Sequence, residues 1–404
     1  MTSTLAHPAL RGRTDDTTGV RRRRLSMPGV ATGTSWLLAS VVVALNMIGL
    51  VMVLSASSVI SVRESGHPWS YAERQVLWSV VGSFALVATL AISLDFWRRH
   101  ARIWLGLALA MLALVLVPGV GVSANGATRW LGSGPLQVQP SEFAKFALLL
   151  FVADLLARRS DRIDDWRWTL APVVTYLTVV AALVMKQPNL GTTIIIAATI
   201  LIMCLAAGVR LVPLGLTTLV GAVAATAFVA YTPFRRTRLL RFLDPMADPL
   251  NTGLQNVQSL VAMANGGLAG RGLGRSTAKW GYLPYAWTDF IFAVIGEEFG
   301  LLGALTVVAL FLAFAVLGAW VASRAEDRFA TLVAIGITAW ITVQAIMNIG
   351  AVIGIMPITG VPLPFVSFGG SALVVNLAAV GMLLNIARHP GEPSGRREAR
   401  VPPR

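Results

Sequence analysis

Charged residues are scarce in this chain. Asp, Glu, Lys and Arg make up only 13% of its 404 residues, about half the share that a soluble globular domain carries. Apolar residues reach 55% and the mean hydropathy is +0.70. Apolar runs recur from residue 33 to residue 387, and a membrane-spanning helix needs about 20 such residues. We therefore expect an all-α fold: a polytopic membrane protein.

Cysteine is nearly absent, because Cys204 is the only one. The chain therefore cannot form an intrachain disulfide. Its net charge of +14 would suggest a nucleic-acid partner in a soluble protein, but the basic residues gather in short loops and in the tails, as membrane orientation requires. We expect no nucleic-acid partner. Arg21–Arg24 precede an apolar run at 35–59 that exceeds the roughly 7–15 residues of a cleaved signal core, so this run is expected to be an uncleaved first helix.

Ten apolar runs indicate about ten transmembrane helices, with a large extracellular loop at 232–298 between the seventh and eighth. Because ten is even, both termini lie on the same side of the membrane. The runs are 35–59, 76–94, 103–120, 141–157, 168–186, 191–207, 211–231, 299–322, 329–353 and 371–387.

The loop charges predict which side of the membrane holds the termini. With the N-terminus inside, the inner loops are 95–102, 158–167, 208–210 and 323–328. Together they hold ten arginines, whereas the outer loop 354–370 holds no Lys or Arg. This bias predicts cytoplasmic termini. Loop 232–298 is basic but too long for the rule to apply. We expect a membrane domain at 33–387 between cytoplasmic tails, 1–32 and 388–404, that are rich in Arg, Pro and Gly and disordered.

An acid stands at the end of the long loop, in the stretch YLPYAWTDFIFAVIGEEFG at 282–300. If the next span begins at Phe299, Asp289 lies on a short helix at the outer interface, among apolar residues. Asp289 is then either a general base or a helix N-cap, a position that its short side chain favours. Glu297 and Glu298 would begin the spanning helix, where the helix dipole favours acids.

A second acid stands near a base, in QVQPSEFAKFALLL at 137–150. Glu142 and Lys145 are spaced i,i+3 and share one helix face. Oppositely charged residues within an apolar helix most often pair with each other, so we favour a structural ion pair over the alternative that they line a substrate cavity. Arg129, the only basic residue of its loop, could reach a phosphate.

The long loop carries a dense basic group of Arg235, Arg236, Arg238 and Arg241, followed by Arg275 and Lys279. Arginine forks match phosphate oxygens, so this surface suits an anionic headgroup. Simple attraction to anionic lipid is the alternative. The glycine-rich NGG and GRGLGRS lack the strand–loop–helix setting of a nucleotide site.

An uncharged stretch rich in Pro, Gly and Ser, MPITGVPLPFVSFGGSA, occupies 356–372. Irregular backbone at membrane depth is tolerated where it lines a cavity, so we expect Ser367 and Ser371 to be near the substrate. Gln344 and Asn348, spaced i,i+4 in the preceding span, are expected to bond to this stretch.

Several of these stretches together resemble the SEDS family, the FtsW, RodA and SpoVE proteins of bacterial division, elongation and sporulation. AKWGYLP and NIARH are most similar to the actinobacterial FtsW branch. The resembling stretches follow the family's order along nearly the whole membrane region: GLVMVLSASS (49–58), QPSEFAK (139–145), KQPNLGTT (186–193), AKWGYLPYAWTDFIFAVIGEEFG (278–300), NIGAVIGIMPITGVPLPFVSFGGSA (348–372) and NIARH (385–389).

The resemblance implies a peptidoglycan glycosyltransferase of ten helices in the bacterial cytoplasmic membrane, at the division septum. It would polymerise lipid II into a growing glycan strand on the outer face and release undecaprenyl diphosphate. Its partners would be a class B penicillin-binding protein and other divisome membrane proteins. A divalent cation, Mg or Mn, is the one cofactor to consider. The family's essential acid matches Asp289, and its Glu and Lys match two of the substrate-binding candidates: Glu142, Lys145, Arg129, Arg235, Arg236, Lys279, Ser367 and Ser371.

Three positions depart from the family pattern: Asn189 replaces a common Asp, Trp287 a frequent His, and Phe368 a usual Tyr. The change at Asn189 removes any accessory role for an acid there. Two other functions fit a ten-helix protein: a transporter that flips lipid II, and a non-catalytic scaffold that recruits division proteins. The scaffold would leave Asp289 and the basic loop without a role.

Overall fold

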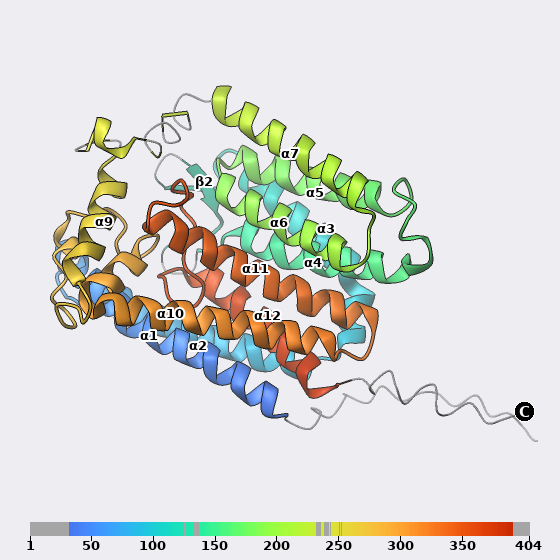
Figure 1. Cartoon of the computed structure of the whole chain (residues 1–404), viewed down its shortest axis with the longest axis horizontal. Helices are drawn as coiled ribbons and strands as arrows, with labels where there is room; N and C mark the ends of the chain where they lie inside the picture. The colour runs from blue at the N-terminus through green and yellow to red at the C-terminus, as the bar shows by residue number, and fades with distance from the viewer. Residues whose placement is uncertain are drawn as a thin grey trace, which may run out of the picture.

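The computed structural model describes residues 32–124, 127–132, 134, 137–231, 236–237, 242, 244–249, 251 and 253–390. Both expected tails lie outside these residues, apart from Thr32 and the residues 388–390, and so does part of the basic loop. The described part is a bundle of long helices that run side by side (Figure 1), with one short hairpin, and all ten predicted spans are helical. The all-α membrane fold is thus confirmed.

The elements follow the apolar runs with small shifts at their ends. In chain order they are α1 (Gly33–Ser65), α2 (Ser70–Ala91), α3 (Leu94–Val115), β1 (Val122–Ala124), β2 (Ala127–Trp130), α4 (Pro140–Arg158), η1 (Ser160–Arg162), α5 (Leu170–Lys186), α6 (Leu190–Ala206), α7 (Leu211–Tyr231), η2 (Pro245–Ala247), α9 (Leu254–Gly266), η3 (Ala278–Trp280), α10 (Ile291–Ser323), α11 (Arg328–Val352) and α12 (Gly370–Arg388). One inner loop, 95–102, was misplaced, because these residues form the first turns of α3.

Six of these helices, α1, α2, α7, α10, α11 and α12, are long and apolar enough to cross a membrane. Helices α5 and α6 have 17 residues each, about 26 Å at 1.5 Å per residue, which is slightly short of the roughly 30 Å hydrocarbon core. The apolar part of α3 is similarly short, and α4 carries four charged side chains along its 19 residues. The exact number of ten crossings therefore stays a prediction.

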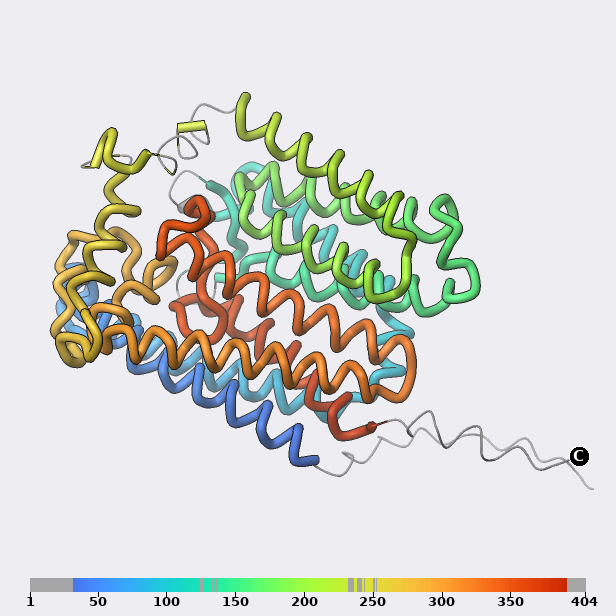
Figure 2. Tube along the Cα trace, viewed as in Figure 1, coloured from blue at the N-terminus to red at the C-terminus, as the bar shows by residue number. Residues whose placement is uncertain are grey.

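Both described ends of the chain lie at the same end of the bundle, where α1 begins and α12 finishes (Figures 1 and 2). The hydroxyl of Thr32 donates to the carbonyl of Ala387 at 3.2 Å and ties these ends together. Helix α9 and the residues around it lie at the opposite end of the bundle, the α9 end. This arrangement is the one that an even number of crossings produces.

Helices α4, α11 and α12 form the centre of the bundle, whereas α7 lies at its edge (Figure 2). Nearly every residue of α4 from Pro140 to Leu156 is buried. In the most apolar stretch of α7, by contrast, only 6% of the residues are buried in the protein. Because bilayer lipid is as apolar as leucine, an uncovered apolar helix is stable there. Three of the four charged residues of α4, Glu142, Lys145 and Asp154, lie in the protein interior, away from lipid, whereas Arg158 at the end of the helix is exposed.

Candidate functional site

Asp289 lies at the α9 end of the bundle, in a turn two residues before α10 begins. The N-cap of α10 is Phe290, which makes no side-chain capping bond. The N-cap alternative for Asp289 is therefore wrong, and so is its placement on a helix. Its side chain is half-buried, a position from which a carboxylate can meet a ligand without facing lipid.

Three successive backbone carbonyls hold this turn in place. The N–H of Phe368 donates to the carbonyl of Trp287 at 3.0 Å. The hydroxyl of Ser367 donates to that of Thr288 at 2.6 Å, and the amide of Asn348 donates to that of Asp289 at 2.7 Å. Hydrogen bonds on consecutive residues leave the backbone little freedom. The position of the Asp289 carboxylate is thus set by helix α11 and by the stretch that follows it.

The uncharged stretch 356–372 is irregular up to α12, as predicted, and wraps around the same turn. Asn348 also donates to Val361 at 2.8 Å, and Gln344 donates to the carbonyl of Pro362 at 2.9 Å, which confirms the expected bonds to this stretch. Ser367 in turn accepts a bond from the N–H of Leu363 at 2.8 Å. Ser367 is therefore placed as a support of the Asp289 turn.

A small pocket opens beside Asp289. A Cβ at Gly360, where φ is +69°, would lie 3.7 Å from Oδ2 of Asp289, an ordinary van der Waals contact, so the carboxylate lies close to the backbone of Gly360. The pocket is lined by residues from three places, namely the Asp289 turn, the end of α11 and the irregular stretch: Asp289, Phe290, Asn348, Ala351, Ile358, Thr359, Gly360 and Val361.

The ion pair predicted on α4 is present. The Nζ of Lys145 lies 2.9 Å from Oε2 of Glu142, and both side chains are almost fully buried. The Lys145 ammonium also donates to Oε1 of Gln344 at 2.9 Å and lies 4.8 Å from the ring centroid of Trp340. Since Gln344 bonds to Pro362 as well, the pair is connected to the stretch that holds Asp289. A direct contact with substrate stays a prediction.

Glu297 lies within α10 and does not begin it, so its predicted role at the start of the span is wrong. Its carboxylate accepts bonds from the hydroxyl of Ser276 at 2.6 Å and from the backbone N–H of Thr277 at 3.1 Å and Ala278 at 3.2 Å. Arg271 completes the set with an ion pair at 3.2 Å. A fully buried carboxylate is stable when donors surround it in this way. Glu297 therefore anchors the loop that returns from α9.

Glu298 does the same one residue later, so the prediction for it was also wrong. Its Oε1 accepts from the hydroxyl of Ser55 on α1 at 2.6 Å and lies 3.8 Å from Nζ of Lys279, which is itself buried. Lys279 also donates to the carbonyl of Gly274 at 2.6 Å. This lysine is placed within the loop's own ion pair, and its predicted contact with a phosphate stays a prediction.

Helix α10 is broken at Gly300, where φ is +66° and ψ is −161°, one residue after the predicted start of the span at Phe299. The returning loop fills the break. The N–H groups of Leu301 and Leu302 donate to the carbonyls of Gly267 and Leu268, and the carbonyls of Glu297 and Glu298 accept from Arg271 and Gly272 at 3.0 and 2.9 Å. Loop and helix thus exchange the hydrogen bonds that an unbroken helix would make within itself.

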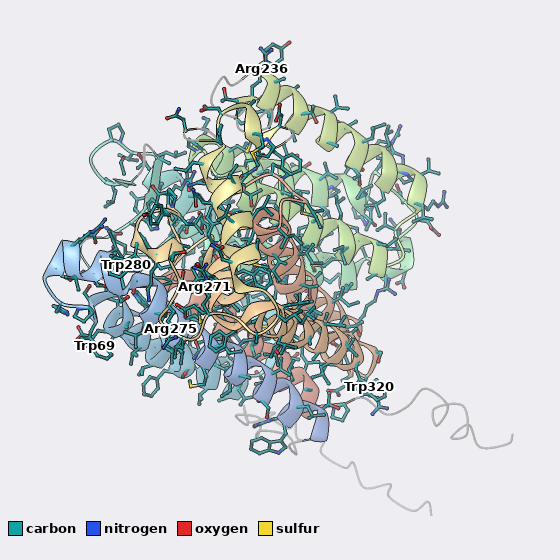
Figure 3. All side chains as sticks on the ribbon, turned by 60° about the vertical axis from the view of Figure 1, so that its left-hand side comes forward. Trp69, Arg236, Arg271, Arg275, Trp280 and Trp320 are labelled. Atoms are coloured by element: carbon teal, nitrogen blue, oxygen red, sulfur yellow. The ribbon has the colours of Figure 1, made fainter. Side chains whose placement is uncertain are left out.

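The other predicted binding residues are spread over the α9 end and the parts beside it. Arg129 donates to the carbonyls of Gln187 and Pro188 and so fixes the turn before α6. Ser371 accepts from the backbone of Gln139 at 3.2 Å. Arg236 is exposed and lies apart from Arg271, Arg275 and Trp280, which Figure 3 shows together. Arg235, Arg238 and Arg241 lie outside the described residues.

An aromatic cluster that was not predicted from the sequence lies next to the Asp289 turn and includes Trp287. The ring of Tyr71 lies 5.6 Å from that of Trp287 and 5.1 Å from that of Phe368, measured between centroids. Two of the three departures from the family pattern therefore pack against one tyrosine. Tilted and edge-on pairs of this kind stabilise a fold beyond their burial. The only available signal was that both departures are aromatic.

The third departure, Asn189, caps helix α6. Its side chain accepts from the N–H of Thr192 at 3.3 Å, which Asn does as well as Asp. Among the described residues, no three His, Cys, Asp or Glu side chains gather in a way that could hold a metal ion. The Mg or Mn requirement stays a prediction.

Comparison with known proteins connects this site to a family. The sequence model described as cell cycle protein, for FtsW, RodA and SpoVE, matches residues 35–392. Stage V sporulation protein E of Bacillus subtilis is 37% identical over 358 residues, which is 89% of this chain and 98% of that protein. The Mycobacterium tuberculosis protein named "Probable peptidoglycan glycosyltransferase FtsW" is 41% identical over 357 residues, 88% of this chain and 68% of that protein.

Solved structures agree with this assignment. A chain of a peptidoglycan synthase complex, described as coordinating polymerization and crosslinking, superposes with a TM-score of 0.74 at 28% identity, over 89% of this chain and 98% of that one. The crystal structure of RodA from Thermus thermophilus gives a TM-score of 0.66 at 26% identity with the same coverage. The chain belongs to the FtsW, RodA and SpoVE family of cell cycle proteins.

Proposed function

We propose that this protein is a peptidoglycan glycosyltransferase that polymerises lipid II on the outer face of the cytoplasmic membrane during cell division. The observation that carries the proposal is the position of Asp289. Its half-buried carboxylate lies at a pocket, and three consecutive backbone carbonyls, ending with its own, accept hydrogen bonds that fix the turn. Relatives named as peptidoglycan glycosyltransferases support the same activity.

In the proposed reaction, Asp289 is the general base. Its carboxylate takes the proton from the 4-hydroxyl of the acceptor's N-acetylglucosamine. The oxygen then forms a bond to the anomeric carbon of the donor's N-acetylmuramic acid. The bond from that carbon to the diphosphate breaks, and its electron pair leaves with undecaprenyl diphosphate. Because diphosphate is a good leaving group, one carboxylate suffices where a glycosidase uses two.

The negative charge of the departing diphosphate needs a cation nearby. Arg129 donates to a backbone carbonyl, and Lys279 lies in an ion pair with Glu298. Each would have to give up its partner to reach a phosphate. Arg236 is exposed, and Arg235 precedes it directly. We therefore propose this arginine pair as the first candidate for the diphosphate, with a divalent cation as the alternative.

The pocket lies at the end of the bundle opposite the described termini. With cytoplasmic termini, which the loop arginines favour, Asp289 faces the outside, where the cell wall is built. We also propose a class B penicillin-binding protein and other divisome membrane proteins as partners, at the division septum. The likeness to a chain of a peptidoglycan synthase complex supports the first of these.

The test is polymerisation of labelled lipid II by the purified protein, alone and with the cognate class B penicillin-binding protein, comparing wild type with Asp289→Asn. We expect glycan strands from wild type and almost none from the variant. Wild-type activity in the variant would remove Asp289 as the base. No strands in any combination, together with lipid II movement across vesicles, would favour the flippase, and neither activity would favour the scaffold.

A further inference from the structure

Asn348 has an amide whose orientation is fixed by its neighbours. Its Nδ2 carries two hydrogens, and the structure gives each one an acceptor: the carbonyl of Asp289 at 2.7 Å and that of Val361 at 2.8 Å. A flipped amide would place an oxygen against both carbonyls and lose both bonds. Oδ1 therefore has one defined direction.

That oxygen has no hydrogen-bond partner in the described part of the chain. Asn348 is only 2% exposed, and it lines the same pocket as Asp289. Buried polar atoms are almost always paired with protein, water or ligand, and leaving an acceptor unpaired is costly. An unpaired, oriented amide oxygen at this pocket indicates that something outside the chain completes it.

The lining restricts what that group can be. Asn348 contributes an acceptor and Asp289 a carboxylate. Thr359 also lines the pocket, and the side chains of Phe290, Ala351 and Val361 are apolar. Two oxygen acceptors side by side suit a ligand with several hydrogen-bond donors. Diphosphate oxygens are acceptors and would be repelled here. The pocket has room for about one water-sized group, so it suits one hydroxyl of a sugar that lies at its mouth.

We propose that Asn348 is an acceptor-sugar binding residue, whose Oδ1 accepts a hydrogen bond from a hydroxyl next to the one that Asp289 deprotonates. The proposal rests on the proposed function, since it names the part of lipid II that enters this pocket. In N-acetylglucosamine the hydroxyls near the attacking 4-hydroxyl are those at carbons 3 and 6. One amide thus both holds the Asp289 turn and orients the nucleophile, because the two tasks use opposite ends of the same group.

The experiment combines a change in the protein with a change in the substrate. Condensation rates are measured with natural lipid II and with analogues whose N-acetylglucosamine lacks the 3-hydroxyl or the 6-hydroxyl, for wild type and Asn348→Ala. In wild type, one of the analogues should react about tenfold more slowly, because it leaves a buried acceptor unpaired. In Asn348→Ala, natural lipid II should react more slowly and the same analogue should show no additional loss.

Asn376→Ala is the matched control. Asn376 is equally buried, and its Oδ1 also lacks a partner in the part of the chain that is described, but it lines a different pocket with Gln344 and Pro362. This variant should keep the full loss with the deoxy analogue. If Asn348→Ala does not fold, Asn348→Ser replaces it in the same comparison.

Three outcomes would overturn the proposal. Wild type could use both deoxy analogues as well as natural lipid II, which would mean that a buried water pairs with Oδ1. The rate losses caused by Asn348→Ala and by the missing hydroxyl could multiply when both changes are combined, which would mean that the two groups do not interact. Asn376→Ala could abolish the analogue effect as Asn348→Ala does. Absence of any condensation by wild type with natural lipid II would instead contradict the proposed function.

Discussion

Acids eight residues apart in this protein have opposite surroundings. The carboxylates of Glu297 and Glu298 are fully buried. Both oxygens of Glu297 accept bonds from the returning loop, and Oε1 of Glu298 contacts Ser55 on α1 and Lys279. Asp289 is half-buried at a pocket, and its backbone carbonyl accepts a hydrogen bond from Asn348 on α11. The two glutamates tie the returning loop to α10, whereas Asp289 lies at a pocket where a substrate hydroxyl can meet its carboxylate.

The largest expected effect is the loss of lipid II turnover in Asp289→Asn, which distinguishes Asp289 from the two structural glutamates. Asp289→Asn keeps the size and polarity of the side chain but removes the base, so turnover of lipid II should fall by about 10²–10⁴-fold. The melting temperature should stay within about 2 °C of wild type, since the backbone bonds are unchanged. Both are measured on the same purified sample. A large fall in melting temperature would mean that Asp289, like Glu297, mainly stabilises the fold.

Glu297→Ala should show the reverse pattern. Removing one partner of a buried charged network costs about 3–5 kcal/mol, so thermal unfolding in detergent should occur at a clearly lower temperature. The loop at 271–278 should also become sensitive to protease. Glu326→Ala, which changes an exposed acid in the turn before α11, is the control and should unfold like wild type. Unchanged stability of Glu297→Ala would contradict its role as the loop's anchor.

The break in α10 gives a smaller, more local test. A Cβ at Gly300 would lie 2.4 Å from the backbone nitrogen of Gly270, at a positive φ, so Gly300→Ala should destabilise the protein by about 1–3 kcal/mol. Gly106→Ala on α3 meets no atom within 4 Å and should be neutral or stabilising by up to about 1 kcal/mol. Equal stability of the two variants would show that the break does not depend on glycine.

The smallest effect is expected at the turn before α6. Asn189→Asp should change stability by less than about 0.5 kcal/mol, because both residues cap a helix equally well. Its activity is the informative quantity, measured with lipid II beside wild type. A marked rise would mean that the acid common in the family assists the reaction; an unchanged rate would leave residue 189 with capping alone.

The positions of the helices could be predicted from the sequence because each apolar run is a local property of the chain. The Glu142–Lys145 pair could also be predicted, since i,i+3 spacing on a helix places the two residues together. The resemblance of TDFIF to the family motif led to Asp289, whereas position alone favoured the N-cap that the structure rules out.

Contacts between distant segments could not be predicted in this way. Nothing in the local sequence says that the loop after α9 returns to Glu297 and Glu298, so an acid pair near a helix start was interpreted as interacting with the helix dipole. The hairpin of β1 and β2 is only three or four residues per strand, too short for a periodic pattern. The role of Asn348 also needed the fold, because its two acceptors are 59 and 13 residues away.

The break at Gly300 has a consequence for how the protein enters the membrane. Leu301–Ser323 alone is about 34 Å long at 1.5 Å per residue, enough to cross the bilayer as an independent hydrophobic segment during synthesis. The segment from Ile291 to Phe299 is not needed for that crossing, and its last turn bonds to the loop after α9 through the carbonyls of Glu297 and Glu298. Insertion of this helix and docking of the loop are therefore separable steps, so variants in the loop should reach the membrane in normal amount.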